Sequence, residues 1–155
     1  NPVLNLEAEF DRSWTSIGRA LERSDLHIED LNAVGGISAI MGVLGRAGLL
    51  PLFEGRIFSA QDPAVARPKP APDVFLHAAQ AMGADPRKTF VIEDTVHGIA
   101  GARAAGMRVI GFTGASHTHP GHADLLTEAV AETVIHRWAD FPAVLAALSE
   151  WSEDA

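Results

Sequence analysis

The amino-acid sequence predicts an α/β protein, a Rossmann-like three-layer sandwich in which helices cover both faces of a parallel sheet. Two observations support this fold class. From residue 56 to residue 151, short β-rich apolar runs alternate with helical patterns of ordinary length. Hydrophobic residues make up 47% and charged residues 21% of the 155 residues, which is typical of a globular domain with its own core. In such a sheet the ligand site lies beyond the carboxyl ends of the strands.

The first part of the chain is expected to be helical. Apolar residues recur at steps of three and four over residues 6–21, which predicts an amphipathic helix. A second helix is expected over residues 37–47, with Gly48 as its C-terminal cap. We therefore divide the chain into a helical segment, residues 1–35, and an α/β core, residues 36–155.

The core is expected to contain four strands, each followed by a helix. The strands are expected at residues 56–59, 89–92, 107–112 and 133–135. The helices are expected at residues 73–82, 96–105 and 121–131, with a last helix that Asp140 caps. The inward residues of that last helix are expected to be Val144, Leu145, Leu148 and Trp151.

Composition argues against several classes of protein. The chain has no cysteine, so it has no disulfide, no thiolate nucleophile and no cysteine-ligated metal. Its net charge is −8 and its only lysines are Lys69 and Lys88, so we expect it to bind neither nucleic acid nor an anionic membrane. No apolar run approaches the about 18 residues of a membrane span. Because no signal-peptide pattern is present either, we expect a cytoplasmic protein.

The first candidate site follows the strand expected at residues 89–92, which runs directly into Glu93, Asp94 and Thr95. Two adjacent carboxylates at the end of a buried strand are costly unless a cation offsets their charge. Mg²⁺ would do so, because it is usually held by one or two carboxylates together with phosphate and water. The alternative is that Asp94 or Thr95 merely caps the following helix, which would leave Glu93 unexplained.

The second candidate is the loop Arg67–Asp73, in which Lys69 stands among prolines just before a helix. Prolines restrict the backbone, so the lysine could be held rigidly. Its ammonium group could then reach an anion near the two carboxylates. The alternative is a solvated lysine in a proline-rich turn.

Histidines form the third candidate. His117, His119 and His122 have a spacing that could bind a transition metal. They follow a strand end without an acidic or thiolate partner at a fixed spacing, so a polar surface loop is the favoured interpretation. The other histidines are expected at the surface; they are His27, His77, His97 and His136.

Three segments resemble the C-terminal half of haloacid dehalogenase-superfamily hydrolases. They are Lys69–Asp73, Val91–Ile99 and Ala102–Met107, and they stand in the order and spacing of that family. Gly48–Gly55 also resembles the stretch that leads to the family's third motif. The resemblance covers roughly residues 34–150 and is nearest to the phosphatases and mutases similar to phosphoglycolate phosphatase and beta-phosphoglucomutase.

The resemblance implies Mg²⁺-dependent phosphoryl transfer from a small phosphorylated metabolite through an aspartyl-phosphate. Lys69 matches the lysine that neutralises the substrate phosphate and the nucleophilic aspartate. Glu93 and Asp94 match the acids that hold Mg²⁺. This acid pair differs from the haloacid dehalogenases proper, whose site does not use Mg²⁺, so the phosphate-directed branch is favoured. Hydrolysis and mutase transfer both remain open.

The family's first two motifs have no good match. The first motif, Asp-x-Asp-x-Thr, has its nearest copy at Phe10–Thr15, where Ser13 replaces the second aspartate. We interpret Asp11 there as coincidental, because Phe10 and Trp14 belong to the helical stripe. The Ser or Thr that ends a strand in the second motif is also missing.

Three explanations are compatible with this half-matched catalytic set. The chain could be part of a larger two-domain hydrolase, with its helical segment the remnant of a cap. It could instead be a degenerate relative with a binding or scaffolding role, or a protein that completes its site with a partner chain. We favour the first explanation. On that basis we expect the chain alone to be poorly stable or to self-associate, because an incomplete parallel sheet exposes an edge.

Overall fold

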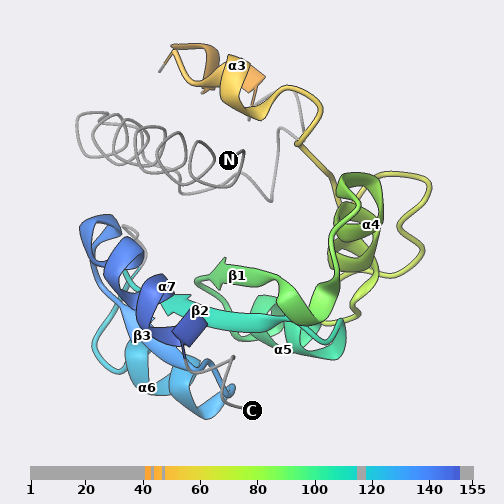
Figure 1. Cartoon of the computed structure of the whole chain (residues 1–155). Coiled ribbons are helices and arrows are strands. Elements are labelled where there is room, and N and C mark those ends of the chain that lie inside the picture. Colours follow the sequence, from red (N-terminus) through yellow and green to blue (C-terminus); the bar gives the residue numbers. More distant parts are fainter. Residues whose placement is uncertain (1–40, 43, 47, 115–117, 151–155) are drawn as a thin grey trace.

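Three parallel strands form a sheet within the part of the chain that the structure describes. The structure is a computed structural model that describes residues 41, 42, 44–46, 48–114 and 118–150. Strand β1 (Phe90–Glu93) pairs with β2 (Arg108–Phe112), and β2 pairs with β3 (Thr133–Ile135), so the strand order is β1-β2-β3 (Figure 1). The predicted parallel α/β class is therefore confirmed.

Helices precede, connect and follow these strands. Helices α3 (Leu50–Phe53) and α4 (Asp73–Met82) precede β1. Helix α5 (Val96–Ala104) joins β1 to β2, α6 (His122–Glu128) joins β2 to β3, and α7 (Phe141–Glu150) follows β3. Short 3-10 turns, η1 (Pro86–Lys88) and η2 (Trp138–Asp140), come before β1 and α7.

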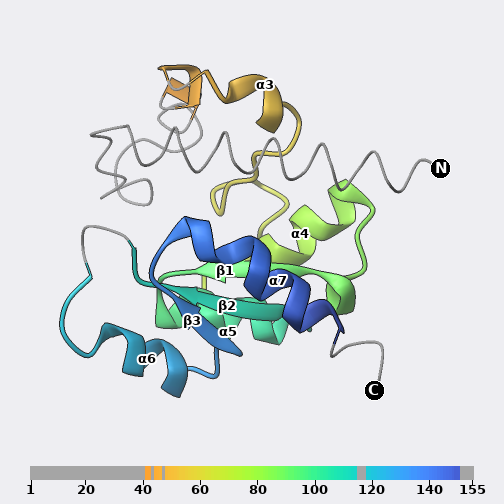
Figure 2. The same ribbon diagram turned by 60° about the vertical axis from the view of Figure 1, so that its left-hand side comes forward.

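The two faces of the sheet carry separate hydrophobic clusters, because successive residues of a strand point to opposite faces. Val109 packs with Ile99 of α5 and Leu126 of α6, and all three side chains are fully buried. Its neighbour Ile110 packs with Phe141 of α7 on the opposite face. Figure 2 shows α5 and α6 on one side of the sheet and α7 on the other. The predicted three-layer arrangement is confirmed.

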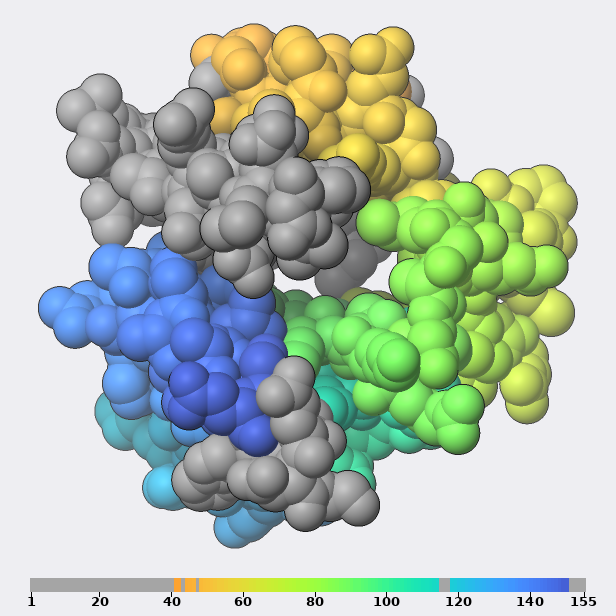
Figure 3. All heavy atoms as spheres, in the orientation of Figure 1, coloured from red at the N-terminus to blue at the C-terminus, as the bar shows by residue number. Residues whose placement is uncertain are grey.

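Helix α4 packs beside β1 and α5. Phe75 of α4 and Val91 of β1 both pack against a small buried cluster formed by Ala79, Ala105 and Met107. The space-filling view shows α4 in light green and α7 in blue on opposite sides of the molecule (Figure 3). The loop that carries Lys69 leads into α4, so the packing of this helix places the loop close to the end of β1.

Several predicted elements are confirmed in detail. Helix α4 has the predicted bounds, and Gly83, with φ 66°, ends it by donating its amide to the carbonyls of Ala79 and Gln80. Strand β3 also has the predicted bounds. The other strands and helices differ from the prediction by one to three residues at their ends. The inward residues of α7 pack on the sheet as expected; they are Val144, Leu145 and Leu148.

The strand predicted at residues 56–59 is wrong. The amide of Arg56 donates to the carbonyl of Phe53 at 2.9 Å, which closes a turn after α3. Residues 56–59 then pair with no strand in the described part of the chain. A β-rich run needs ladder hydrogen bonds to become a strand, and local sequence alone does not supply them.

Some predictions fall outside the residues that the structure describes. They are the helix at residues 6–21, the segment 1–35, Asp11, His27, His117 and Trp151. Of the helix predicted over residues 37–47, the described residues 41, 42 and 44–46 are helical. Across the described ranges, no helix is long and apolar enough to cross a membrane.

Candidate active site

The carboxyl end of β1 carries the two acids and the start of α5. Glu93 is the last residue of β1, and Thr95 is the residue immediately before α5. The Thr95 hydroxyl oxygen accepts a hydrogen bond from the amide of Gly98 at 3.0 Å and so caps the helix. Thr95 alone therefore fills the capping role. Capping explains neither Glu93 nor Asp94, both of which are partly buried.

Lys69 pairs with Glu93, as the sequence suggested it could. Its Nζ donates to Glu93 Oε1, and the two side chains are 30% and 10% exposed. The same Nζ lies 5.1 Å from the centroid of the Phe75 ring, a cation–π contact that holds the ammonium group from the α4 side. A solvated lysine is therefore the wrong interpretation. At the carboxyl end of β1, the fold thus brings together a positive charge and a carboxylate that are 24 residues apart in sequence.

The Glu93 carboxylate has a second partner and a close neighbour. Its Oε2 accepts a hydrogen bond from the Thr95 hydroxyl at 3.1 Å. A Cβ placed on Gly98 would lie 2.0 Å from Glu93 Cδ, far inside van der Waals contact. Glycine at position 98 is thus what allows the carboxylate to lie over the first turn of α5. The sequence assigns no role to Gly98; the available signal is its place three residues after a capping threonine.

The loop before α4 is closed by a second ion pair. Asp73, the first residue of α4, accepts hydrogen bonds from the Arg67 backbone amide at 3.1 Å and from its Nη2 at 2.8 Å. These hydrogen bonds hold the pKa of Asp73 below its ordinary value, and the Asp73 carboxylate raises the pKa of Arg67. The contact ties together the two ends of the segment that carries Lys69.

His122 differs from the prediction of a polar surface loop. It is the first residue of α6, and only 6% of it is exposed. Its Nε2 donates to the backbone carbonyl oxygen of Asp94 at 2.9 Å. His119 is exposed and its ring stacks on that of His122, with 5.2 Å between the centroids. Sequence reasoning missed this role of His122, because the contact joins residues 28 positions apart and no periodicity reports it.

The remaining described histidines are only partly as predicted. His97 and His136 are exposed, as expected for surface positions. His77 is half-buried, and its ring meets that of Phe58 edge to face, with 5.7 Å between the centroids. Over the described ranges, no group of three or more histidine, cysteine or acidic side chains could hold a metal ion. The alternative of a histidine-rich metal site gains no support there.

A polar network also joins the carboxyl ends of β2 and β3. Thr113, which is 7% exposed, donates its amide to the Ile135 carbonyl at 3.0 Å. Its hydroxyl contacts Nδ1 of His136, and its carbonyl accepts a hydrogen bond from the Thr118 hydroxyl at 2.8 Å. These residues follow the carboxyl ends of β2 and β3, as Glu93 ends β1. Polar side chains therefore stand at the carboxyl ends of β1, β2 and β3.

The fold is that of a Rossmann-like α/β domain. Comparison with solved structures indicates which family within this class the chain resembles. A conserved haloacid dehalogenase-like protein of unknown function from Agrobacterium tumefaciens strain C58 is 43% identical in sequence, with a TM-score of 0.70 over 96% of this chain and 70% of that chain. A HAD family hydrolase from Deinococcus radiodurans R1, solved with bound phosphate and sodium, is 33% identical, with a TM-score of 0.62 over 73% of this chain and 49% of that chain.

Sequence comparisons point to the same family. The family model of the haloacid dehalogenase-like hydrolases matches residues 36–106. Fructose-1-phosphate phosphatase YqaB from Escherichia coli strain K12 is 55% identical over 42 residues, which are 27% of this chain and 22% of that protein. The chain belongs to the haloacid dehalogenase-like hydrolases. It spans less than two thirds of the length of the curated relatives that it matches.

Proposed function

We propose that the chain supplies the lysine and the two metal-binding acids of a Mg²⁺-dependent phosphohydrolase that acts on a small phosphorylated metabolite. The observation that carries this proposal is the pairing of Lys69 with Glu93 next to Asp94, at the carboxyl end of β1. Family membership supports it, as does similarity to a fructose-1-phosphate phosphatase and to a hydrolase solved with phosphate.

The donor set fits a hard divalent cation. Glu93 and Asp94 offer carboxylate oxygens, which Mg²⁺ prefers, and Mg²⁺ commonly takes one or two carboxylates with its other positions filled by water and phosphate. Each Glu93 oxygen keeps a lone pair beyond its contact with Lys69 or Thr95. When bound, Mg²⁺ would counter the negative charge of a phosphoryl group during its transfer.

Lys69 has two tasks in this proposal. Without substrate, its ammonium group offsets the charge of Glu93, which would otherwise be costly to bury so deeply. With substrate, the same ammonium group, a compact point charge on a flexible stem, faces the phosphate as well. The Phe75 ring and the closed Arg67–Asp73 loop limit how far the lysine can move.

The attacking group is not identified within the chain. No aspartate in the sequence is followed two positions later by another, so the Asp-x-Asp motif implied by the resemblance is missing. We propose that an aspartate from a further segment or a second chain completes the site, and that residues 1–35 belong to a cap. The absence of the motif also favours one alternative, a binding module of the same family that does no catalysis.

Hydrolysis of 4-nitrophenyl phosphate by this chain, with Mg²⁺ or with EDTA, tests the proposal. If the chain turns over this substrate in the presence of Mg²⁺, the turnover should fall about 100-fold in Asp94→Asn, because the lost negative charge weakens Mg²⁺ binding. It should also fall in Lys69→Met, whereas the matched control Lys88→Met, at an exposed position, should be unaffected. Turnover would make Asp11 the first nucleophile to test.

Calorimetric titration with Mg²⁺ separates the remaining outcomes. Mg²⁺ binding that depends on Asp94, without turnover, would mean that the chain holds half of a catalytic site. A folded chain that neither binds Mg²⁺ nor turns over substrate would overturn the proposed function and favour the binding module.

A further inference from the structure

The first residue of α6 contacts the acidic turn that follows β1. His122 makes this contact through its Nε2–H, which donates to the Asp94 carbonyl oxygen at 2.9 Å. The imidazole is buried at the start of α6, although histidine is a polar side chain that usually stays partly exposed. A buried polar ring at this point calls for an explanation beyond the packing of α6.

The Thr118 side chain lies at the other side of the His122 ring. The ring Nδ1 lies 3.3 Å from the Thr118 hydroxyl oxygen. The hydroxyl of Thr118 in turn donates to the carbonyl of Thr113 at 2.8 Å. Thr113 follows β2 directly and is hydrogen-bonded to β3 through Ile135. Thr118 and Thr113 therefore connect the surroundings of the imidazole to the central part of the sheet.

The contact acts on the part of the turn that the helix cap does not control. Thr95 caps α5 and fixes the peptide groups that follow it. The carbonyl of Asp94 belongs to the peptide group between Asp94 and Thr95. The orientation of this group helps to set the direction in which the Asp94 side chain leaves the backbone. Thr95 and His122 therefore fix the peptide groups that follow Asp94, and strand β1, which ends at Glu93, fixes the backbone before it.

We propose that His122 is a positioning residue that aligns Asp94 for metal binding, by holding the Asp94 carbonyl through its Nε2–H. This inference rests on the proposed function, in which Asp94 is a ligand of Mg²⁺. His122 is not itself a metal ligand or a catalytic residue. Partners that orient a metal ligand contribute to metal affinity, and their removal typically weakens binding at least about tenfold.

The experiment compares three variants of the full chain. His122→Leu removes the donor and keeps an apolar volume under α6. His122→Gln places an amide NH₂ near the position of Nε2, so it should rescue the contact. His97→Ala removes an exposed imidazole from the neighbouring helix and serves as the matched control. Each variant is measured by amide hydrogen exchange of residues 93–98 without metal, by Mg²⁺ titration calorimetry, and by its melting temperature.

The expected result is specific to the Asp94 turn. His122→Leu should speed exchange in residues 93–98 and raise the Mg²⁺ dissociation constant about tenfold. His122→Gln should restore most of both properties, and His97→Ala should match the wild type. Unchanged exchange and unchanged Mg²⁺ affinity in His122→Leu would overturn the inference. So would an equal loss in the Leu and Gln variants that follows the melting temperature, because that pattern marks a purely structural side chain.

The proposed function and this inference can fail separately. If Asp94→Asn abolishes Mg²⁺ binding but His122→Leu leaves it intact, the function stands and the inference falls. If the wild type binds no Mg²⁺, the function falls and the metal-positioning role falls with it, whatever the exchange data show. If His122→Leu does not fold, the comparison of His122→Gln with the wild type decides, because rescue requires the same donor geometry.

Discussion

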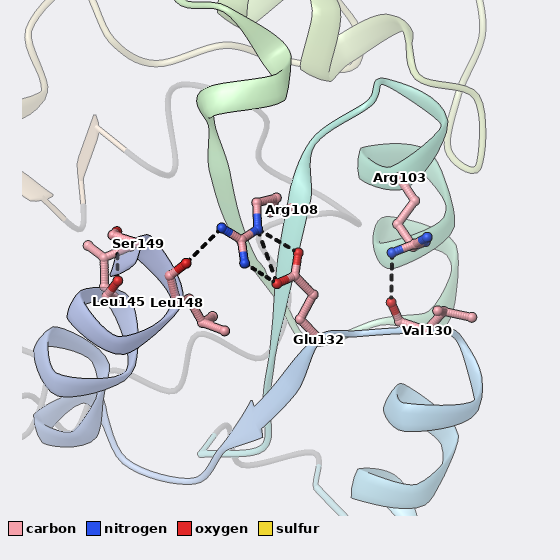
Figure 4. Close-up of polar contacts among 7 residues, drawn as sticks. All are labelled: Arg103, Arg108, Val130, Glu132, Leu145, Leu148 and Ser149. Atoms are coloured by element: carbon pink, nitrogen blue, oxygen red, sulfur yellow. Dashed lines mark hydrogen bonds and ion pairs between the residues drawn. The ribbon is translucent and has the colours of Figure 1, made fainter. Parts of the chain in front are cut away.

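The two ends of the sheet use ion pairs in different ways. At the amino end, Arg108 starts β2 and donates through Nε and Nη2 to Glu132, at 2.9 Å and 2.6 Å, and through Nη1 to the Leu148 carbonyl at 2.9 Å (Figure 4). Its guanidinium also stacks on Phe90, with 4.5 Å to the ring centroid. One side chain thus links β1, β2, α7 and the segment before β3.

At the carboxyl end, the cation is a lysine and the pair is simpler. Lys69 contacts Glu93 as a single point charge, beside a second acid, Asp94. A planar guanidinium fork fixes its partners in one geometry, whereas an ammonium group accepts several partners in turn. The amino end is therefore arranged for stability, and the carboxyl end carries an excess of negative charge that a cation or a substrate can meet. Mutations should separate these two roles.

The largest loss of stability is expected from Arg108→Ala. The substitution leaves the Leu148 carbonyl and the Glu132 carboxylate without this donor and uncovers the Phe90 ring, so the free energy of unfolding should fall by about 2 kcal/mol. Urea denaturation measures it. Arg108→Lys keeps the positive charge without the planar guanidinium. Its free energy of unfolding should lie between those of the wild type and Arg108→Ala. Mg²⁺ affinity should not change; a tenfold loss would contradict the separation of the two ends.

A smaller loss of stability, with a loss of function, is expected from Gly98→Ala. The new Cβ would displace the Glu93 carboxylate and break its pairing with Lys69. Overpacking costs about 1–3 kcal/mol, and the better helix propensity of alanine returns about 1 kcal/mol, so we expect a net loss of about 1 kcal/mol. Calorimetry should also show weaker Mg²⁺ binding. Gly101→Ala, also within α5, would crowd Phe75 and the loop that carries Lys69, so it shows the effect of crowding the lysine side without displacing the Glu93 carboxylate directly.

The contrast between the ends explains what could be predicted from sequence. The sequence could predict that Lys69 lies near Glu93, because the end of an apolar strand and a proline-rich loop are local patterns, and the topology of a parallel sheet brings such segments together. The role of His122 depends on a hydrogen bond to a backbone carbonyl, which any residue type supplies at position 94. No side-chain pattern could have indicated that partner.

The errors in secondary structure have a related cause. The run at residues 56–59 has strand-forming residues, but strand pairing is a tertiary property that the local sequence does not contain. Helix α6 ends at Glu128, earlier than its helical pattern suggested, because the chain turns through Val130 with φ 68°. Valine rarely adopts that conformation, so its presence does not indicate a turn at this position.

A substitution of Val130, near the amino end of the sheet, is expected to stabilise the protein. A β-branched residue with positive φ costs about 1–2 kcal/mol, and Val130 is 55% exposed, so little packing is lost on its removal. Val130→Gly should raise the free energy of unfolding by about 0.5–1 kcal/mol after the greater entropy of glycine in the unfolded chain is counted. Its carbonyl keeps the hydrogen bond from Arg103 (Figure 4). Val130→Ala, which keeps a Cβ, should gain much less; an equal gain would contradict backbone strain as the cause.

The smallest effect concerns the pH dependence of the Lys69 loop at the carboxyl end. Arg67 lowers the pKa of Asp73 in the folded protein, so the unfolded chain binds this proton more readily than the folded one. The stabilisation is present above the ordinary pKa of an aspartate, about 4, and is lost as the pH falls through the lower pKa of the folded state. Asp73→Asn should therefore reduce the loss of stability between neutral pH and pH about 3.

Parallel urea denaturations at several pH values measure this loss of stability. Salt at about 0.5 M should shrink the difference between the variant and the wild type, because Arg67 is 69% exposed. A pH profile identical to that of the wild type would mean that the Arg67–Asp73 pair does not hold the loop, and that Phe75 and the prolines alone place Lys69 beside Glu93.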